Sequence, residues 1–117
     1  MNARRWLRCL AMLGLVLNVA TAYAAENSYQ ELVSLFQRWR TFEAPDRLDG
    51  APDYTAAAMQ RKREGLRQLQ AELAAMDVRS WPVEQQVDYH LIRAEMNGLD
   101  FRLRVLAPWQ RDPAFYA

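Results

Sequence analysis

The sequence predicts an all-α protein: three helices follow an N-terminal export signal, and the second and third form a long antiparallel hairpin. Apolar residues recur at spacings of three and four in three separate blocks, which is typical of helices with one buried face. No block shows the strict alternation of a half-buried strand. Proline, glycine and aspartate gather between the blocks. A chain of 117 residues has room for one domain.

The first 24 residues have the three parts of a secretory signal peptide. Three arginines precede the almost wholly apolar run Cys9–Ala20, and Ala22-Tyr23-Ala24 places small residues where signal peptidase recognises them. A membrane anchor is the rival interpretation, but a run of about a dozen residues is shorter than the roughly 20 that a spanning helix needs. We therefore expect cleavage after Ala24, a helical segment over residues 25–117, and a periplasmic or secreted product without a membrane span.

The single cysteine, Cys9, leaves with the signal. It stands at the start of the apolar run, whereas the cysteine of a lipoprotein signal follows that run. The mature segment therefore lacks disulfides, thiolate nucleophiles and cysteine-ligated metals. Loss of Arg4, Arg5 and Arg8 from the 15 basic residues leaves 12 against 14 acidic side chains, a net charge of −2. This balance argues against nucleic acid as a partner.

The first helix is predicted over Tyr29–Phe42. Its apolar residues form one broad face, which consists of Tyr29, Leu32, Val33, Leu35, Phe36, Trp39 and Phe42. The next segment, Ala44–Asp53, contains the turn-forming pairs Pro45-Asp46, Asp49-Gly50 and Pro52-Asp53. We expect a loop there and no strand.

The second helix is predicted over Tyr54–Met76, with Asp53 or Thr55 as its cap. Its apolar stripe, which Lys62 interrupts, consists of Met59, Leu66, Leu69, Leu73 and Met76. Gly65 should weaken the helix by about 1 kcal/mol relative to alanine. A free coiled coil is the alternative, but the pattern lasts only about three heptads and lacks ordered flanking charges. The short link Asp77–Ser80 favours an antiparallel neighbour.

The third helix is predicted over Trp81–Leu106, with Ser80 as its cap and Pro82 in its first turn. It is apolar on two sides. The first stripe consists of Val83, Val87, Leu91, Ala94, Gly98, Phe101 and Val105; the second consists of Tyr89, Ile92, Met96, Leu99, Leu103 and Leu106. A helix that is apolar on two sides should be buried on both sides. The first and second helices would not cover all of this apolar surface. We expect the remainder of a larger chain, or a protein partner, to cover this helix and the aromatic residues after Pro108.

No catalytic, cofactor-binding or metal residue is assigned from the sequence. His90 is the only histidine, and Ala94 stands where a His-Glu-x-x-His motif would need its second histidine. We interpret His90 as structural. The alternative is a general base oriented by Asp88, but residues two apart on a helix do not face each other.

A line of charges, Asp88, Glu95 and Arg102, separates the two stripes at intervals of seven residues. A covered charge needs a partner. We expect the two carboxylates to pair with arginines of the second helix, such as Arg63 or Arg67. In the alternative, Asp88 or Glu95 points into a ligand cavity, where acid–base chemistry would need a second carboxylate at a matched distance.

Much of the chain resembles the N-terminal region of a bacterial family, domain-of-unknown-function 885. The segments that carry the resemblance are Asp88–Met96, Leu99–Leu106, Pro108-Trp109, Arg111-Asp112-Pro113-x-Phe115-Tyr116, Phe36-x-x-Trp39 and Pro52-Asp53-Tyr54. Members of that family are several times longer, exported or lipid-anchored, and look like helical zinc metallopeptidases whose His-Glu-x-x-His motif lies far downstream. The resemblance implies that this chain is a non-catalytic wall or lid of such a protein, with any zinc held elsewhere in the full-length molecule. A small periplasmic interaction module without enzymatic activity is the alternative.

Overall fold

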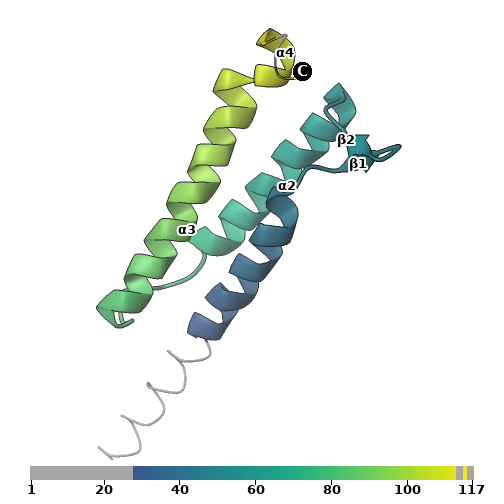
Figure 1. The fold of residues 1–117 in the computed structure, drawn as a ribbon. Helices are drawn as coiled ribbons and strands as arrows, with labels where there is room; N and C mark the ends of the chain where they lie inside the picture. The colour runs from purple at the N-terminus through teal and green to yellow at the C-terminus, as the bar shows by residue number, and fades with distance from the viewer. Residues whose placement is uncertain (1–27, 113–114, 116–117) are drawn as a thin grey trace, which may run out of the picture.

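The computed structural model describes residues 28–112 and residue 115, so the predicted signal peptide and its cleavage site lie outside the described residues. Within these limits the chain forms three long helices, as the sequence predicts (Figure 1). The first covers residues 28–43, α2 covers Ala56–Ala74 and α3 covers Val83–Phe101. The all-α class is confirmed, because strands take up only two short pairs of residues in this part of the chain.

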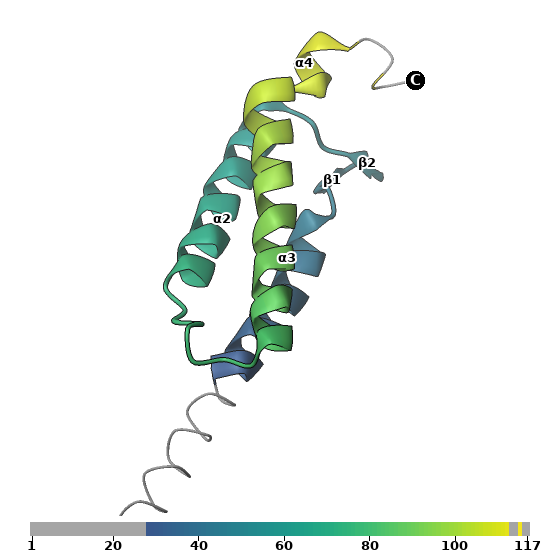
Figure 2. The same ribbon diagram turned by 90° about the vertical axis from the view of Figure 1, so that its left-hand side faces the viewer.

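The three helices run side by side with α2 in the opposite direction to the other two (Figures 1 and 2). The predicted antiparallel pairing of α2 and α3 is therefore confirmed. The first helix lies against the part of α3 that includes Asp88 and Glu95, which Tyr29 and Trp39 contact. The C-terminal half of α3 extends beyond the first helix toward the short helix α4, which covers Pro108–Arg111 (Figure 2).

The core lies where the three helices meet. Its largest fully buried side chains are Trp39, Leu32, Leu35, Leu66 and Met96. The stripe of α2 faces this core, and so do Tyr89, Ile92, Met96 and Leu103 of the second stripe of the third helix. Full burial of an aliphatic side chain of this size contributes about 1.5–3 kcal/mol relative to exposure.

Both predicted capping residues take part at the start of α2, whereas the predicted cap of α3 is wrong. The Thr55 hydroxyl accepts a hydrogen bond from the amide of Ala58 at 3.2 Å, and Asp53 accepts one from the amide of Thr55 at 2.9 Å. At α3 the N-cap residue is Pro82 instead of Ser80. Proline has φ fixed near the value that a helix entry needs, so α3 begins after it without a side-chain cap.

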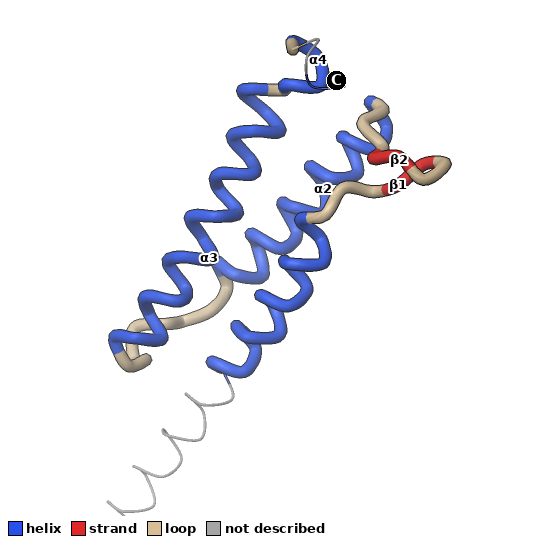
Figure 3. The backbone as a smooth tube through the Cα atoms, viewed as in Figure 1, coloured by secondary structure: helices blue, strands red, loops and turns tan. Residues whose placement is uncertain are grey.

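The predicted loop after the first helix contains a small β-hairpin, so the expectation of no strand was wrong (Figure 3). Strand β1 (Arg47–Leu48) pairs antiparallel with β2 (Ala51–Pro52). Asp49 and Gly50 form the turn with φ values of 52° and 84°. Two positive φ values in a two-residue loop are the geometry of a type I′ hairpin turn, which Asp-Gly favours. Strands of two residues are too short to show an alternating pattern.

Lys62 and Gly65 of α2 hold the end of the first helix. Lys62, which interrupts the apolar stripe in the sequence, is buried within that stripe, and its ammonium donates to the backbone carbonyls of Phe42 and Ala44. Burial lowers the pKa of Lys62. The Phe42 ring packs over Gly65 so closely that an added Cβ would lie 2.7 Å from Phe42 Cε2. The glycine therefore makes room for the ring.

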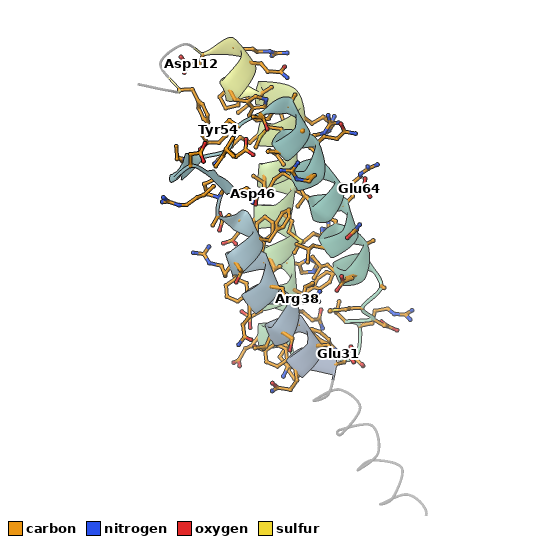
Figure 4. All side chains as sticks on the ribbon, turned by 90° about the vertical axis from the view of Figure 1, so that its right-hand side faces the viewer. Glu31, Arg38, Asp46, Tyr54, Glu64 and Asp112 are labelled. Carbon is orange, nitrogen blue, oxygen red and sulfur yellow. The ribbon has the colours of Figure 1, made fainter. Side chains whose placement is uncertain are left out.

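The predicted third helix changes from α-helical to π-helical geometry before it ends. After Phe101 the backbone widens into π-helical turns over Arg102–Leu106, and Ala107 then adopts a left-handed conformation with φ of 40°. Pro108 disfavours a right-handed helical conformation for the residue before it, so the helix stops where the sequence predicts. Tyr54 and Asp112 lie near this end of the molecule (Figure 4). There the Tyr54 ring meets that of Phe115, with centroids 4.6 Å apart.

Candidate functional site

A largely apolar groove of about 340 Å³ runs between the first helix and α3. Its lining residues are Tyr29, Leu32, Val33 and Phe36 from the first helix, and Asp88, Leu91, Ile92 and Glu95 from α3. Other hollows are larger, including one between the first helix and the end of α2 and one between α2 and the residues that follow α3, but these two are lined mainly by charged and amide side chains. The groove between the first helix and α3 is therefore the candidate site.

The apolar face of the first helix supplies both the core and one wall of the groove. Leu32, Leu35 and Trp39 are buried beneath the helix. Val33 and Phe36 lie on the part of the face that turns toward the groove, and Phe36 remains 38% exposed. The broad apolar face noted in the sequence is thus divided between buried packing and an accessible wall.

The two carboxylates of the groove each accept a hydrogen bond from an aromatic side chain of the first helix. The Tyr29 hydroxyl donates to Asp88 Oδ2 at 2.8 Å, and the Trp39 indole N–H donates to Glu95 Oε2 at 3.0 Å. Trp39 itself is fully buried. These contacts fix both carboxylates beside the groove, about 10 Å apart along the helix axis at 1.5 Å per residue.

The expected pairing of Asp88 and Glu95 with arginines of the second helix was wrong. The first helix, and not α2, lies against the charged side of α3. Arg67 instead pairs with Glu64 of its own helix. Asp88 and Glu95 both line the groove. Their position is therefore closer to the alternative, in which a carboxylate points into a cavity.

Neither carboxylate has a lysine or arginine within ion-pair distance among the residues that the structure describes. A carboxylate offers about four acceptor positions, and the structure shows one side-chain donor for each of them. Asp88 is partly buried and Glu95 is exposed. The groove therefore combines apolar walls with two negative charges that no cation of the described chain neutralises.

The first stripe of α3 continues the groove as an uncovered apolar surface. Its exposed members and their exposed fractions are Val83 75%, Val87 49%, Leu91 59%, Phe101 49% and Val105 37%. From Val87 to Val105 the apolar positions of this stripe follow each other at alternating intervals of four and three residues, as the core positions of a heptad do. We call residues 87, 91, 94, 98, 101 and 105 the α3 seam. Such spacing is typical of a surface that packs against another helix.

The described residues do not fit the zinc site of the family that the sequence resembles. Within residues 28–112 no three or more histidine, cysteine, aspartate or glutamate side chains come together as metal ligands. His90 is exposed, and its ring meets the edge of the Tyr89 ring with centroids 5.3 Å apart.

Neither a protein-family model, nor a curated protein, nor a solved structure matches this chain. The resemblance to the domain-of-unknown-function 885 family stays a prediction. Across the described residues, no helix has both the length and the apolar character that crossing a bilayer requires.

Proposed function

We propose that this chain is a non-catalytic helical region that docks, through the groove and the α3 seam, onto further polypeptide of an exported protein. The observation that carries the proposal is the contrast between the two apolar stripes of α3. Tyr89, Ile92, Met96 and Leu103 of the second stripe are buried, and its last residue, Leu106, is half exposed. The first stripe leaves Val87 and Leu91 about half exposed within α3 itself. Contiguous apolar surface of this kind marks interaction sites, because soluble proteins rarely leave it in water.

In its leading form the proposal follows the resemblance to the domain-of-unknown-function 885 family. The further polypeptide is then the remainder of a metallopeptidase-like protein, and this region is a wall or lid of its substrate channel. The predicted signal peptide supports a periplasmic or secreted location. In the second form, a small interaction module uses the same seam on a separate partner protein.

The mass of the native product separates the two forms. An antibody to residues 28–112 captures the protein from its own host, and mass spectrometry gives the intact mass. A mass several times the 13.6 kDa of this chain, with zinc and peptidase activity in the whole protein, supports the leading form. A mass no greater than that of this chain overturns the leading form and leaves the interaction module.

A variant of the seam tests the docking itself. We expect Leu91→Arg to release the covering polypeptide, which limited proteolysis of the native product would detect as faster cleavage. The matched control is Gln60→Arg, which places the same charge at an exposed position of α2. Equal cleavage of both variants and the wild type would contradict docking through the seam.

A further inference from the structure

We infer that the occupant of the groove is a single amphipathic α-helix that carries two basic side chains, seven residues apart, opposite Asp88 and Glu95. This inference rests on the proposed docking function and specifies the chemistry of the partner. Its basis is the juxtaposition of an uncovered helical seam with two carboxylates that have no cationic partner in the described chain.

The spacing of the α3 seam indicates that the occupant is a helix. Intervals of four and three residues match the period at which one helix interdigitates with another. The α-helical part of the seam, from residue 87 to residue 101, is about 21 Å long at 1.5 Å per residue. Its centre holds Ala94 and Gly98, and nothing lies within 4 Å of the place where a Gly98 Cβ would stand. Small residues at the centre of a seam allow two helix backbones to approach closely.

The two carboxylates indicate that the occupant is basic on one flank. A helix seated on the seam would remove water from Asp88 and Glu95, and a desolvated carboxylate without a cation is strongly unfavourable. Tyr29 and Trp39 are neutral donors, so they orient the carboxylates without cancelling their charge. Lysine or arginine on the incoming helix supplies the missing charge. Because the carboxylates are seven residues apart, the matching basic residues lie on one face of that helix.

A second copy of this chain satisfies the carboxylates less well. In an antiparallel pair of seams, equivalent flanks meet. Arg102 of one copy would then reach Asp88 of the other, but Glu95 would lie against Glu95 of the other copy and the like charges would repel. In a parallel pair, Glu95 would lie near His90, which carries no permanent positive charge. Neither arrangement gives Glu95 a lysine or arginine, whereas a separate basic helix does.

Two synthetic peptides test the inference by isothermal titration calorimetry on the purified protein. Both are helical and share one leucine seam with 4,3 spacing; the first has lysines seven residues apart beside the seam, and the second has glutamates at the same two positions. We expect the lysine peptide to bind at least about tenfold more tightly. Methyl chemical shifts of Val87 and Leu91 should move on binding, because these side chains form the seam.

Substitution of Asp88 and Glu95 tests whether these two carboxylates cause the preference for the lysine peptide. In the Asp88→Asn/Glu95→Gln variant the preference for the lysine peptide should disappear, while an acceptor oxygen remains for Tyr29 and Trp39. The control Glu31→Gln removes an exposed carboxylate on the other side of the first helix, beside the end of α2 (Figure 4). It should leave the preference unchanged.

Each other result overturns the inference in a distinguishable way. Equal binding of both peptides overturns the basic partner and leaves the docking function standing. Binding of neither peptide to a monomeric protein overturns both proposals. A dimer that excludes the peptides and dissociates on Leu91→Arg substitution overturns the basic partner in favour of a second copy.

Discussion

Gly65 and Gly98 stand in the middle of two helices but in opposite surroundings. A Cβ at Gly65 would lie 2.7 Å from the Phe42 ring, whereas one at Gly98 would meet nothing within 4 Å. Alanine is favoured over glycine in a helix by about 1 kcal/mol. We expect Gly98→Ala to raise the free energy of unfolding by about 0.5–1 kcal/mol, and Gly65→Ala to lower it by about 1–2 kcal/mol because the ring must move. Urea denaturation measures both.

A double variant isolates the cause of the Gly65 effect. Phe42→Leu removes the ring atoms that the new methyl group would strike. In that background Gly65→Ala should become less destabilising than it is in the wild type, because the new methyl group no longer strikes the ring and the helix preference for alanine remains. If the penalty of Gly65→Ala is the same in both backgrounds, contact with the ring is not its cause.

The link between α2 and α3 contains an ion pair whose carboxyl should titrate well below its ordinary range. Arg79 donates from Nε to Asp77 Oδ1 at 2.8 Å and from Nη2 to Oδ2 at 2.6 Å. These side-chain hydrogen bonds, followed by that from the Arg79 amide, lower the pKa of Asp77 from 3.8 to about 2. Because the folded-state pKa is the lower one, the stabilisation is complete above about pH 4 and is lost as the pH falls toward 2.

Carboxyl-carbon NMR across this pH range measures the titration of Asp77 directly. Arg79→Gln should return the pKa toward its ordinary value, whereas Arg63→Gln, an exposed position on α2, should leave it unchanged. Both members of the pair are largely exposed, so the associated change in stability should be small. An Asp77 pKa near 3.8 in the wild type would contradict the hydrogen-bonded geometry.

Shortening a side chain of α3 should change the stability of the protein by very different amounts on the two sides of the helix. Met96 is fully buried, whereas Leu91 is 59% exposed. We expect Met96→Ala to lower the free energy of unfolding by about 2–5 kcal/mol, because it leaves a cavity in the core. Leu91→Ala should change it by less than about 0.5 kcal/mol. A large loss of stability for Leu91→Ala would show that the seam is already covered in the isolated protein.

The end of the first helix should depend on Lys62 of α2. Its ammonium donates to the carbonyls of Phe42 and Ala44 and lies 4.4 Å from the centre of the Phe42 ring. Lys62→Met preserves much of the side-chain length but leaves both carbonyls without this donor. We expect a loss of about 1–3 kcal/mol, the usual range for buried polar groups that lose their partner. Thermal denaturation measures the loss, and Arg63→Met is the exposed control.

The sequence predicted the elements better than their side-chain partners. Helical periodicity located all three helices, and the excess apolar stripe of α3 indicated the uncovered surface, because both are properties of one segment at a time. The partners of Asp88 and Glu95 depend on which helix covers the charged side of α3, which periodicity does not determine. The role of Lys62 was missed for a similar reason: the carbonyls that it binds belong to another element.

For the molecule as a whole, the small core and the uncovered seam imply limited stability without a partner. A domain of under 100 residues buries a modest share of its surface on folding. A ligand that binds only the folded state adds stability by mass action, about 2.7 kcal/mol when its free concentration is a hundred times its Kd. For a domain of this size, each kcal/mol raises the Tm by about 4–8 °C.

The lysine peptide should therefore raise the Tm of the whole chain by more than about 10 °C at a hundredfold excess over its Kd. Gly98→Ala should stabilise the free protein. It should nevertheless reduce the rise in Tm that the peptide causes, because a methyl group at the centre of the seam keeps the peptide helix away from α3. Differential scanning fluorimetry over a range of peptide concentrations measures both effects. If Gly98→Ala leaves the peptide-dependent shift unchanged, the peptide does not lie on the seam, and the groove is not its binding site.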